Sequence, residues 1–327
     1  MTVVAPVRRA GTLVPVGASA IRLAAAGRPS EEQLATLAAL IARHAPGGER
    51  TAIDGVLVSA FDAPTEPMAS TTGTVFALVA QGAKRLGLGD RVYDYRAGQY
   101  LVASIDLPIT GHFTEASPEA PALGFGLVLR PASIAALLLD AGLAGPAAAR
   151  RGRGPAPPAL GVADASSELV DAAIRMLRLL DAPADRPVLA PAVEREILWR
   201  LVTGPLGEAV RQIGLADSSL THISRAVRRI SARFDEAFRV EDLAHDCGMS
   251  ASAFHRSFLA ATGSSPLQFQ KRIRLQQARL MLMTGVDDVA TIGYRVGYES
   301  ASQFNREYRR RFGRPPGQDA ALLRGER

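Results

Sequence analysis

The sequence is poor in several residue types that support particular chemistries. Its 327 residues include one cysteine, Cys247, and five histidines. A lone cysteine excludes a disulfide framework and a zinc site built from several thiolates. No apolar run approaches the roughly eighteen residues that span a membrane. Prolines and an arginine interrupt the short apolar runs near the start, which makes a secretory signal peptide a poor match. We therefore expect a cytoplasmic protein without a membrane segment.

The composition that remains allows two domains, and its charge is distributed unevenly. The apolar content of 47% is enough for a core in each domain. Residues 221–327 hold 18 Lys and Arg against 11 Asp and Glu, whereas residues 1–220 hold 20 against 21. A basic last third beside a neutral remainder is typical of a nucleic-acid-binding domain joined to a partner domain.

The N-terminal half shows one helical pattern followed by short strand patterns. Leucines at helical spacing predict an amphipathic helix over residues 31–45. Residues 51–130 alternate β-branched and aromatic residues with Gly, Asp and Pro breaks, and Gly89-Asp90 between two such runs predicts a hairpin turn. We expect a small antiparallel barrel or sandwich over this region.

Helical patterns occupy most of the second half. A Pro-, Gly- and Arg-rich loop at 150–161 precedes two amphipathic helices, which we expect to start at Ser166 and Pro191. Trp199 lies among apolar residues of the second helix, where we expect it to pack in the core. From residue 220 onward, six or seven helices in about a hundred residues predict a compact all-α domain.

This last domain contains an internal repeat. The stretch SASAFHRSFLAATGSSP at 250–266 aligns with SASQFNREYRRRFGRPP at 300–316 at a constant offset of fifty residues. Each stretch follows a short helical pattern and a glycine, Gly248 or Gly297, and begins at a serine suited to cap a helix. Helix, glycine-containing turn and second helix form the helix-turn-helix unit, whose second helix enters the DNA major groove.

Helical spacing divides the second helix of each unit into two faces. Phe254 and Phe258, or Phe304 and Tyr308, lie one turn apart and should face the core. The other faces carry side chains that suit base edges. These are Ser252, His255, Arg256, Ser302, Gln303, Asn305 and Arg306. Between the units, residues 266–284 can form a 19-residue helix about 28 Å long, close to the roughly 34 Å that separates successive major grooves on one DNA face.

The residues from VEDLAHDCGM through RRRFGRPP resemble the AraC/XylS family of bacterial transcription regulators over about a hundred residues. Residues around FALVAQG and ALGFGLVL also resemble the N-terminal domain of one AraC-type subfamily. The resemblance implies an α+β multidomain chain. Its N-terminal part would be a cupin-like antiparallel β-barrel with flanking helices, and its C-terminal part an all-α domain with two helix-turn-helix units joined by a linker helix.

The resemblance also implies roles for individual residues. Ser252, His255 and Arg256 match base-facing positions of the first unit, and Ser302, Gln303 and Arg306 match those of the second. His255 departs from the residue types common at its position, so base preference does not transfer. We expect phosphate contacts from Ser250, Ser300, Arg309, Arg310 and Arg311, and an effector pocket near Gln81, Tyr100 and His112. The expected partners are promoter DNA, a small-molecule effector, RNA polymerase and a second copy of the chain.

These patterns predict a domain order and leave one alternative function open. We expect a flexible extension at 1–30, a helix and sensor barrel at 31–160, a helical linker or dimerisation region at 161–219, and a DNA-binding domain at 220–327. The two units of that domain should lie near 240–262 and 287–312. In the alternative, the barrel only dimerises and the protein binds DNA without an effector.

The small numbers of histidines and cysteines argue against three other functions: a metal site, an alkyl acceptor and an oxidant sensor. His112 has no second histidine within sixty residues, so a cupin-type metal site cannot be assembled and we expect neither metal, cofactor nor enzyme activity. A DNA-repair alkyl acceptor would need several cysteines. We expect Cys247 to be a small buried residue at a helix end rather than an oxidant sensor.

Overall fold

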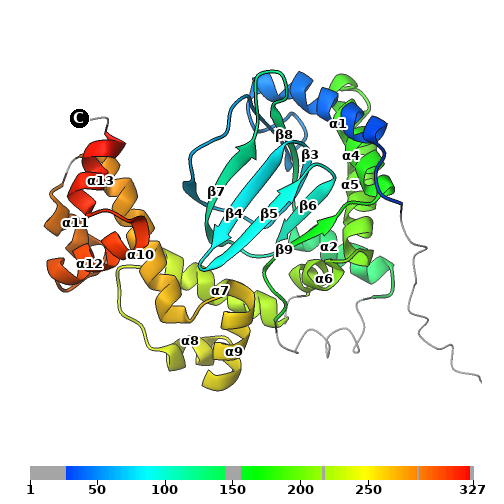
Figure 1. Cartoon of the computed structure of the whole chain (residues 1–327). Coiled ribbons are helices and arrows are strands. Elements are labelled where there is room, and N and C mark those ends of the chain that lie inside the picture. Colours follow the sequence, from blue (N-terminus) through cyan, green and yellow to red (C-terminus); the bar gives the residue numbers. More distant parts are fainter. Residues whose placement is uncertain (1–26, 144–155, 216–217, 286, 325–327) are drawn as a thin grey trace, which may run out of the picture.

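The computed structural model describes residues 27–143, 156–215, 218–285 and 287–324. The flexible extension expected at residues 1–30 lies outside the described residues up to residue 26, and the first half of the loop expected at 150–161 also lies outside them. A β-domain with packed helices is followed by a helical domain (Figure 1). In the described part, no helix combines the length and apolar content needed to cross a bilayer.

Two antiparallel sheets face each other in the β-domain. The five-stranded sheet has the order β1 (Val56–Phe61), β8 (Ala122–Val128), β3 (Val75–Gln81), β6 (Gln99–Ala103) and β9 (Leu160–Asp164). The four-stranded sheet has the order β2 (Met68–Thr71), β7 (Pro108–Glu115), β4 (Ala83–Leu88) and β5 (Arg91–Arg96). The predicted hairpin joins β4 and β5, and Gly89 supplies the positive φ of 63° that its turn requires.

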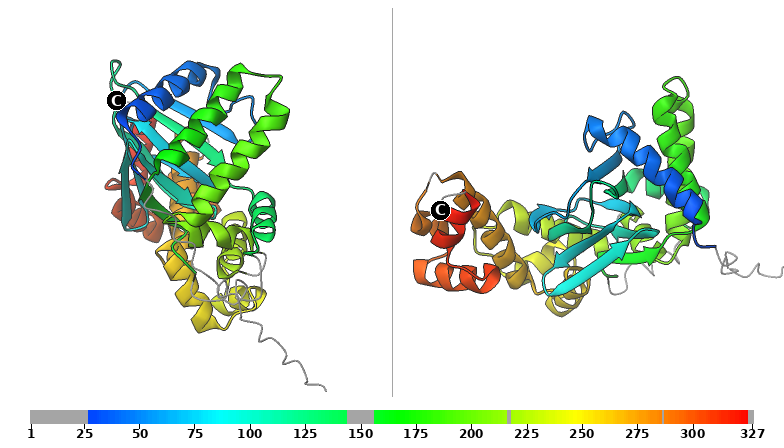
Figure 2. Two further views of the ribbon diagram at one scale, coloured as in Figure 1. Left: turned by 90° about the vertical axis from the view of Figure 1, so that its right-hand side faces the viewer. Right: turned by 45° about the horizontal axis from the view of Figure 1, so that its top comes forward.

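Helices cover the outer face of the five-stranded sheet (Figure 2). They are α1 (Glu31–His44), α2 (Pro131–Asp140), α4 (Ser167–Arg178), α5 (Arg186–Thr203) and α6 (Gly207–Gly214). Alternation along each strand divides its side chains: Tyr100 and Val102 of β6 join the core beneath these helices, whereas Leu101 faces the space between the sheets. Trp199 packs half-buried against the helix-side core, as expected.

Two boundaries differ from those expected. Residues 160–164 form β9 and pair with β6, so the sheet domain extends past residue 160 into the region expected to be helical. This pairing joins segments about sixty residues apart, which local periodicity does not report. In addition, α5 begins at Arg186 rather than Pro191. Pro187 lies in its first turn, where backbone amides have no acceptor within the helix, so proline costs no hydrogen bond there.

The C-terminal domain is all helical, as predicted. Its described elements are α7 (Ser219–Ala232), α8 (Val240–Asp246), α9 (Ala251–Thr262), α10 (Pro266–Thr284), α11 (Val289–Arg295), α12 (Ala301–Phe312) and α13 (Pro316–Leu323). The pairs α8–α9 and α11–α12 are the two repeated units, and α10 is the connector with the predicted bounds (Figure 1). A capping box at Ser265 starts α10, and Gly285 ends it in the left-handed conformation.

The β-domain and the first repeated unit share one hydrophobic cluster. It contains Leu88 and Ile109 from the sheet together with Phe258 and Phe269 from the helical domain. Two hydrogen bonds cross the same junction: the Ala159 amide donates to the Ala261 carbonyl at 3.1 Å, and Gln276 Nε2 donates to the Ile109 carbonyl at 3.4 Å. The two domains are therefore packed against each other in this structure.

Candidate nucleic-acid interface

The second helix of each repeated unit starts in the same way. Ser250 Oγ accepts a hydrogen bond from the Ala253 amide at 3.3 Å, and Ser300 Oγ accepts one from the Gln303 amide at 3.4 Å. The preceding turns use glycine at positive φ, 64° at Gly248 and 87° at Gly297. These serines are N-caps, as the sequence predicts.

Buried aromatic pairs anchor α9 and α12 to their units. The ring centroids of Phe254 and Phe258 lie 5.5 Å apart, and those of Phe304 and Tyr308 lie 5.6 Å apart. All four side chains are fully buried, as their spacing predicts. Cys247 caps the C-terminal end of α8 and is buried, as expected. Burial raises the pKa of its thiol.

With the aromatic faces turned inward, the polar faces of α9 and α12 remain open to solvent. The exposed members of the predicted reader set are Ser252, His255, Arg256, Ser302, Asn305 and Arg306. The expected phosphate contacts on α12, Arg309, Arg310 and Arg311, are exposed as well. The structure therefore presents two polar surfaces from corresponding helices, each beginning in the first turn after a capped start. Gln303 differs because it is half-buried.

Gln303 belongs to a polar cluster that the sequence reasoning did not identify. Its Nε2 donates to Glu307 Oε1 at 3.2 Å. The same Oε1 accepts from Lys271 Nζ at 2.8 Å, and Glu307 Oε2 accepts from the Tyr298 hydroxyl at 3.0 Å. The spacing of four residues between Gln303 and Glu307 was a visible signal for their contact. The partners from α10 and the turn before α12 were not visible in the sequence.

Arg274, near the middle of α10, holds the two units in a defined relation. Its Nε donates to the Phe234 carbonyl, in the loop before α8, at 2.6 Å. Its Nη1 donates to the Gly297 carbonyl, in the turn before α12, also at 2.6 Å. Because one planar guanidinium binds the loop that leads into the first unit and the turn within the second unit, we expect it to resist rotation of the units about the connector.

The space between the two sheets contains a cavity of about 340 Å³. Its wall combines apolar side chains with several hydroxyl-bearing residues and two charged residues, Glu49 and Lys84. The inward-facing residues of β3, Val75, Ala77 and Val79, contribute to the wall, and Gly124 and Gly126 of β8 leave space because they have no side chains. A cavity of this volume between two sheets can take a small molecule.

One charged side chain from β4, Lys84, lines this cavity. Its Nζ lies 4.7 Å from the centre of the Phe113 ring. Burial lowers the pKa of Lys84, although the Glu49 carboxylate opposes this effect. Among the described residues, no ion pair of 4.0 Å or less includes the Lys84 ammonium. Glu49 lines the same cavity, but its carboxylate does not lie within ion-pair distance of the ammonium, so Lys84 is a candidate anchor for an anionic group.

The residues expected to form an effector pocket lie elsewhere. Tyr100 points to the helix-covered face, where its ring packs on Phe76 with centroids 5.4 Å apart. Gln81 Nε2 donates to the Pro121 carbonyl at 2.8 Å, and His112 lies on β7 beside the paired residues of β4. The structure does not bring these three residues together, and none of them lines the cavity between the sheets.

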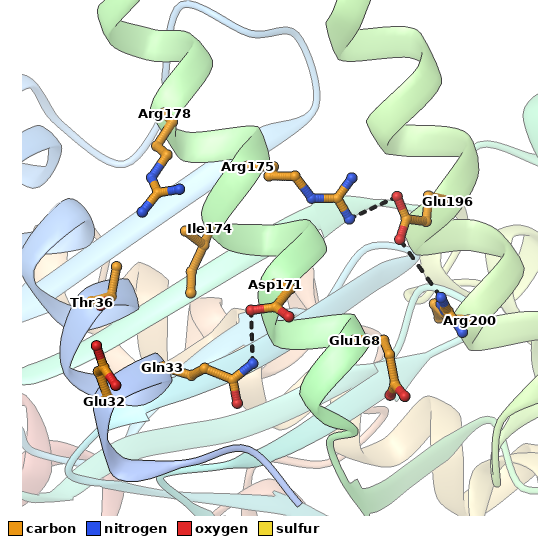
Figure 3. A pocket seen from close by; sticks show the side chains of 10 residues that line it. All are labelled: Glu32, Gln33, Thr36, Glu168, Asp171, Ile174, Arg175, Arg178, Glu196 and Arg200. Atoms are coloured by element: carbon orange, nitrogen blue, oxygen red, sulfur yellow. Dashed lines mark hydrogen bonds and ion pairs between the residues drawn. The ribbon is translucent and has the colours of Figure 1, made fainter. Parts of the chain in front are cut away.

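A second, open pocket of about 570 Å³ lies between α1, α4 and α5 (Figure 3). Charged side chains line it, and many of them pair with one another. Glu196 contacts Arg175 at 2.7 Å and Arg200 at 3.8 Å, and Asp171 accepts from Gln33 at 2.7 Å. These internal pairs account for most of its polar groups. In the described residues, no three His, Cys, Asp or Glu side chains are grouped so that they could hold a metal ion.

The chain has two helix-turn-helix units on one connecting helix, packed beside a β-domain with an internal cavity. This arrangement places it in the class of proteins with two helix-turn-helix units. Comparison with protein families identifies the class further. Residues 52–209 match the model of the AraC-type transcriptional regulator N-terminus, and residues 243–321 match a helix-turn-helix domain model. The chain belongs to the AraC/XylS family of transcriptional regulators, as the sequence motifs predict.

Curated relatives are regulators from bacteria. The chain is 25% identical over 155 residues to the HTH-type transcriptional regulator ExsA of Pseudomonas aeruginosa, covering 47% of this chain and 55% of that protein. It is 31% identical over 111 residues to the HTH-type transcriptional activator RhaS of Escherichia fergusonii, covering 32% of this chain and 39% of that protein. The matches thus span about half or less of the length of these relatives.

The chain also aligns with solved structures of other proteins. ToxT from Vibrio cholerae, with unsaturated fatty acid bound, aligns with a TM-score of 0.48 and 12% identity, over 84% of this chain and 98% of that one. The DNA-binding domain of AdpA, in complex with a target DNA, aligns with a TM-score of 0.31 and 32% identity, over 32% of this chain and 95% of that one.

Proposed function

We propose that this protein binds specific DNA sites through α9 and α12 and regulates transcription in the cytoplasm without enzyme activity of its own. The observation that carries this proposal is the pair of exposed polar helix faces, each held by a buried aromatic pair. Arg256 and Arg306 occupy matching exposed positions in the two units. Arginine binds guanine O6 and N7 in a bidentate manner, so these two side chains are our strongest candidates for base reading.

The basic turn at the end of α12 supports binding of a different kind. Arg309, Arg310 and Arg311 are exposed in the last turn, where they would meet phosphates and add salt-dependent affinity without sequence information. Ser250 and Ser300 use their hydroxyl oxygens as caps, which leaves each hydroxyl hydrogen available to a phosphate.

We also propose that a small, largely apolar molecule with one anionic group binds in the cavity between the sheets. The apolar side chains of the wall suit its body, and the Lys84 ammonium suits its charge, whereas Glu49 on the same wall would repel an anionic group placed near it. The same strand links this cavity to the DNA-binding domain, because β4 continues from Lys84 to the hairpin at Gly89, which lies against Arg272 of α10. A ligand acts as an effector only if it binds one arrangement of the two domains more tightly than another.

DNA recognition is tested by selection of duplexes from a random library with the purified full chain. We expect one enriched site with two segments about one helical turn apart. Recovery of no common sequence would contradict the proposed DNA recognition. Gel filtration of the protein–DNA complex tests whether two copies of the chain bind together. Transcription from the selected site with purified RNA polymerase tests whether the protein acts on the polymerase.

The effector is tested by thermal unfolding of the full chain with octanoate and benzoate against the matched alcohols. We expect stabilisation by an acid and a smaller effect of its alcohol, and loss of this difference in Lys84→Met. If neither these acids nor neutral analogues change the unfolding temperature or the affinity for the selected DNA, the alternative is favoured: an effector-independent DNA-binding protein whose barrel only mediates dimerisation.

A further inference from the structure

One predicted base reader on α12 is held by the protein itself. Gln303 donates its Nε2 to Glu307 Oε1, one helical turn further along. An ionised carboxylate only accepts hydrogen bonds, so the Gln303 amide must turn its NH₂ group toward Glu307. Its Oε1 then points away from Glu307. The amide orientation is therefore set by the chemistry of its neighbour.

The surroundings of Glu307 keep its carboxylate ionised and fixed. The side chain is 10% exposed, and it accepts from Lys271 and Tyr298 in addition to Gln303. Burial alone would raise the pKa of Glu307, but the hydrogen bonds outweigh it and hold the pKa below its usual value. Burial raises the pKa of the Tyr298 hydroxyl, so this group stays protonated and donates.

The fixed amide suits one purine better than the other. Adenine offers a donor at N6 and an acceptor at N7, whereas guanine offers two acceptors, O6 and N7. The outward Oε1 of Gln303 can accept from adenine N6 while its second N–H donates to N7. Guanine would need a second outward donor in place of Oε1, and the NH₂ group already has one hydrogen bonded to Glu307.

We propose that Gln303 reads an adenine in the major groove, and that Glu307 is a positioning residue that disfavours guanine there by fixing the Gln303 amide. This inference rests on the proposed DNA recognition by α12. Its internal comparison is the first unit, where the positions fifty residues earlier are Ala253 and Ser257. That pair cannot form the same contact, so the adenine preference belongs to the DNA segment bound by the second unit.

The test is the same duplex selection, carried out with the full wild-type chain, Gln303→Met and Glu307→Gln. Gln303→Met should lose the adenine preference at one position of one segment and keep the others. Glu307→Gln retains the volume of the side chain, but its neutral amide can donate or accept, so Gln303 becomes free to turn. Discrimination of adenine over guanine at that position should fall about tenfold, equivalent to about 1.4 kcal/mol. Gln318→Met, an exposed change of the same type on α13, should alter no position.

A base analogue tests the contact without altering the protein. A wild-type complex in which 7-deazaadenine replaces the selected adenine lacks the N7 acceptor, and we expect about tenfold weaker binding. The Gln303→Met variant should show no further loss with this base. This measurement remains informative if thermal unfolding shows that Glu307→Gln does not fold.

Each other outcome overturns a defined part of the proposal. Recovery of no common sequence by the wild type removes the proposed DNA recognition, and this inference with it. A common site in which Gln303→Met alters no position, or alters one that selects guanine, removes the adenine reader alone. An unchanged ratio of adenine to guanine in folded Glu307→Gln, or equal weakening at all positions, removes the positioning role.

Discussion

Replacement of Arg274 by leucine should uncouple the two helix-turn-helix units while each remains folded. The Phe234 carbonyl also accepts from Gln270 Nε2 at 2.9 Å, so it keeps one partner in the variant. The Gly297 carbonyl loses its 2.6 Å bond to the guanidinium. A hydrogen bond to a charged group contributes about 1.5–3 kcal/mol, and Arg274 is only half-buried. We expect the free energy of unfolding of the helical domain to fall by about 2 kcal/mol, measured in urea.

The effect on DNA spacing should be larger than the effect on stability. One inserted base pair moves the second segment by about 3.4 Å and rotates it by about 34°. The wild-type units, held by Arg274, should bind such a duplex much more weakly than the selected one. The leucine variant should bind the selected duplex more weakly than wild type but lose little further affinity on insertion, because its units can reorient. Fluorescence anisotropy with duplexes of both spacings, at fixed salt, measures the two losses.

Arg279→Leu is the matched control for Arg274→Leu. Arg279 lies on the same helix and contacts Asp319 of α13 at 3.0 Å, and Asp319 also accepts from Tyr308 of α12, so this contact joins the connector to α13 and through it to the second unit. Its loss should lower stability but leave the penalty for insertion unchanged. The reasoning is refuted if Arg274→Leu is folded and still shows the full wild-type penalty for an inserted base pair, since the two units would then be oriented by other contacts.

Four other substitutions test three separate parts of the molecule. Arg306→Ala should weaken binding to the selected site by about 1–3 kcal/mol and relax one base position, whereas Arg310→Ala should weaken binding to all duplexes and reduce the salt slope by about one, both measured by anisotropy across a salt series. Because burial depresses the pKa of Lys84, the unfolded chain binds its proton more readily, so wild-type stability should rise with pH from the folded pKa toward 10.5. Lys84→Met should be more stable near neutral pH and lack this rise. If the free energy of unfolding, measured in urea, changes equally with pH in both proteins, the lowered pKa of Lys84 is contradicted. Gly89 adopts a φ of 63°, which a β-branched residue rarely takes, and a Cβ there would overlap the Arg272 guanidinium, so Gly89→Val should distort the hairpin and loosen it from α10. Faster hydrogen exchange at the start of α10 is the expected result, and unchanged exchange would show that the hairpin does not hold the domains together.

The sequence alone predicted the parts of this protein that depend on neighbours close along the chain. A capping serine, a glycine at a turn and an aromatic pair one turn apart act within a few residues, so the two units and the 19-residue connector could be located before the structure was known. The repeat added confirmation because the same local pattern occurred twice, as Phe254 and Phe304 show.

Only the tertiary structure decided which side chains meet across distant segments. Strand alternation indicates that Tyr100 and Lys84 each point to one side of a sheet, but it does not indicate which side the helices cover. The positions of the helices place Tyr100 in the core beneath them and Lys84 in the cavity between the sheets. In the DNA-binding domain, Lys271 meets Glu307 from a position 36 residues away, and Arg274 joins two turns that no local rule connects. Local hydrogen bonds and periodicity determine helices and turns. The orientation of the Gln303 amide and the relation between the two units depend on packing, which brings distant residues within a few ångströms.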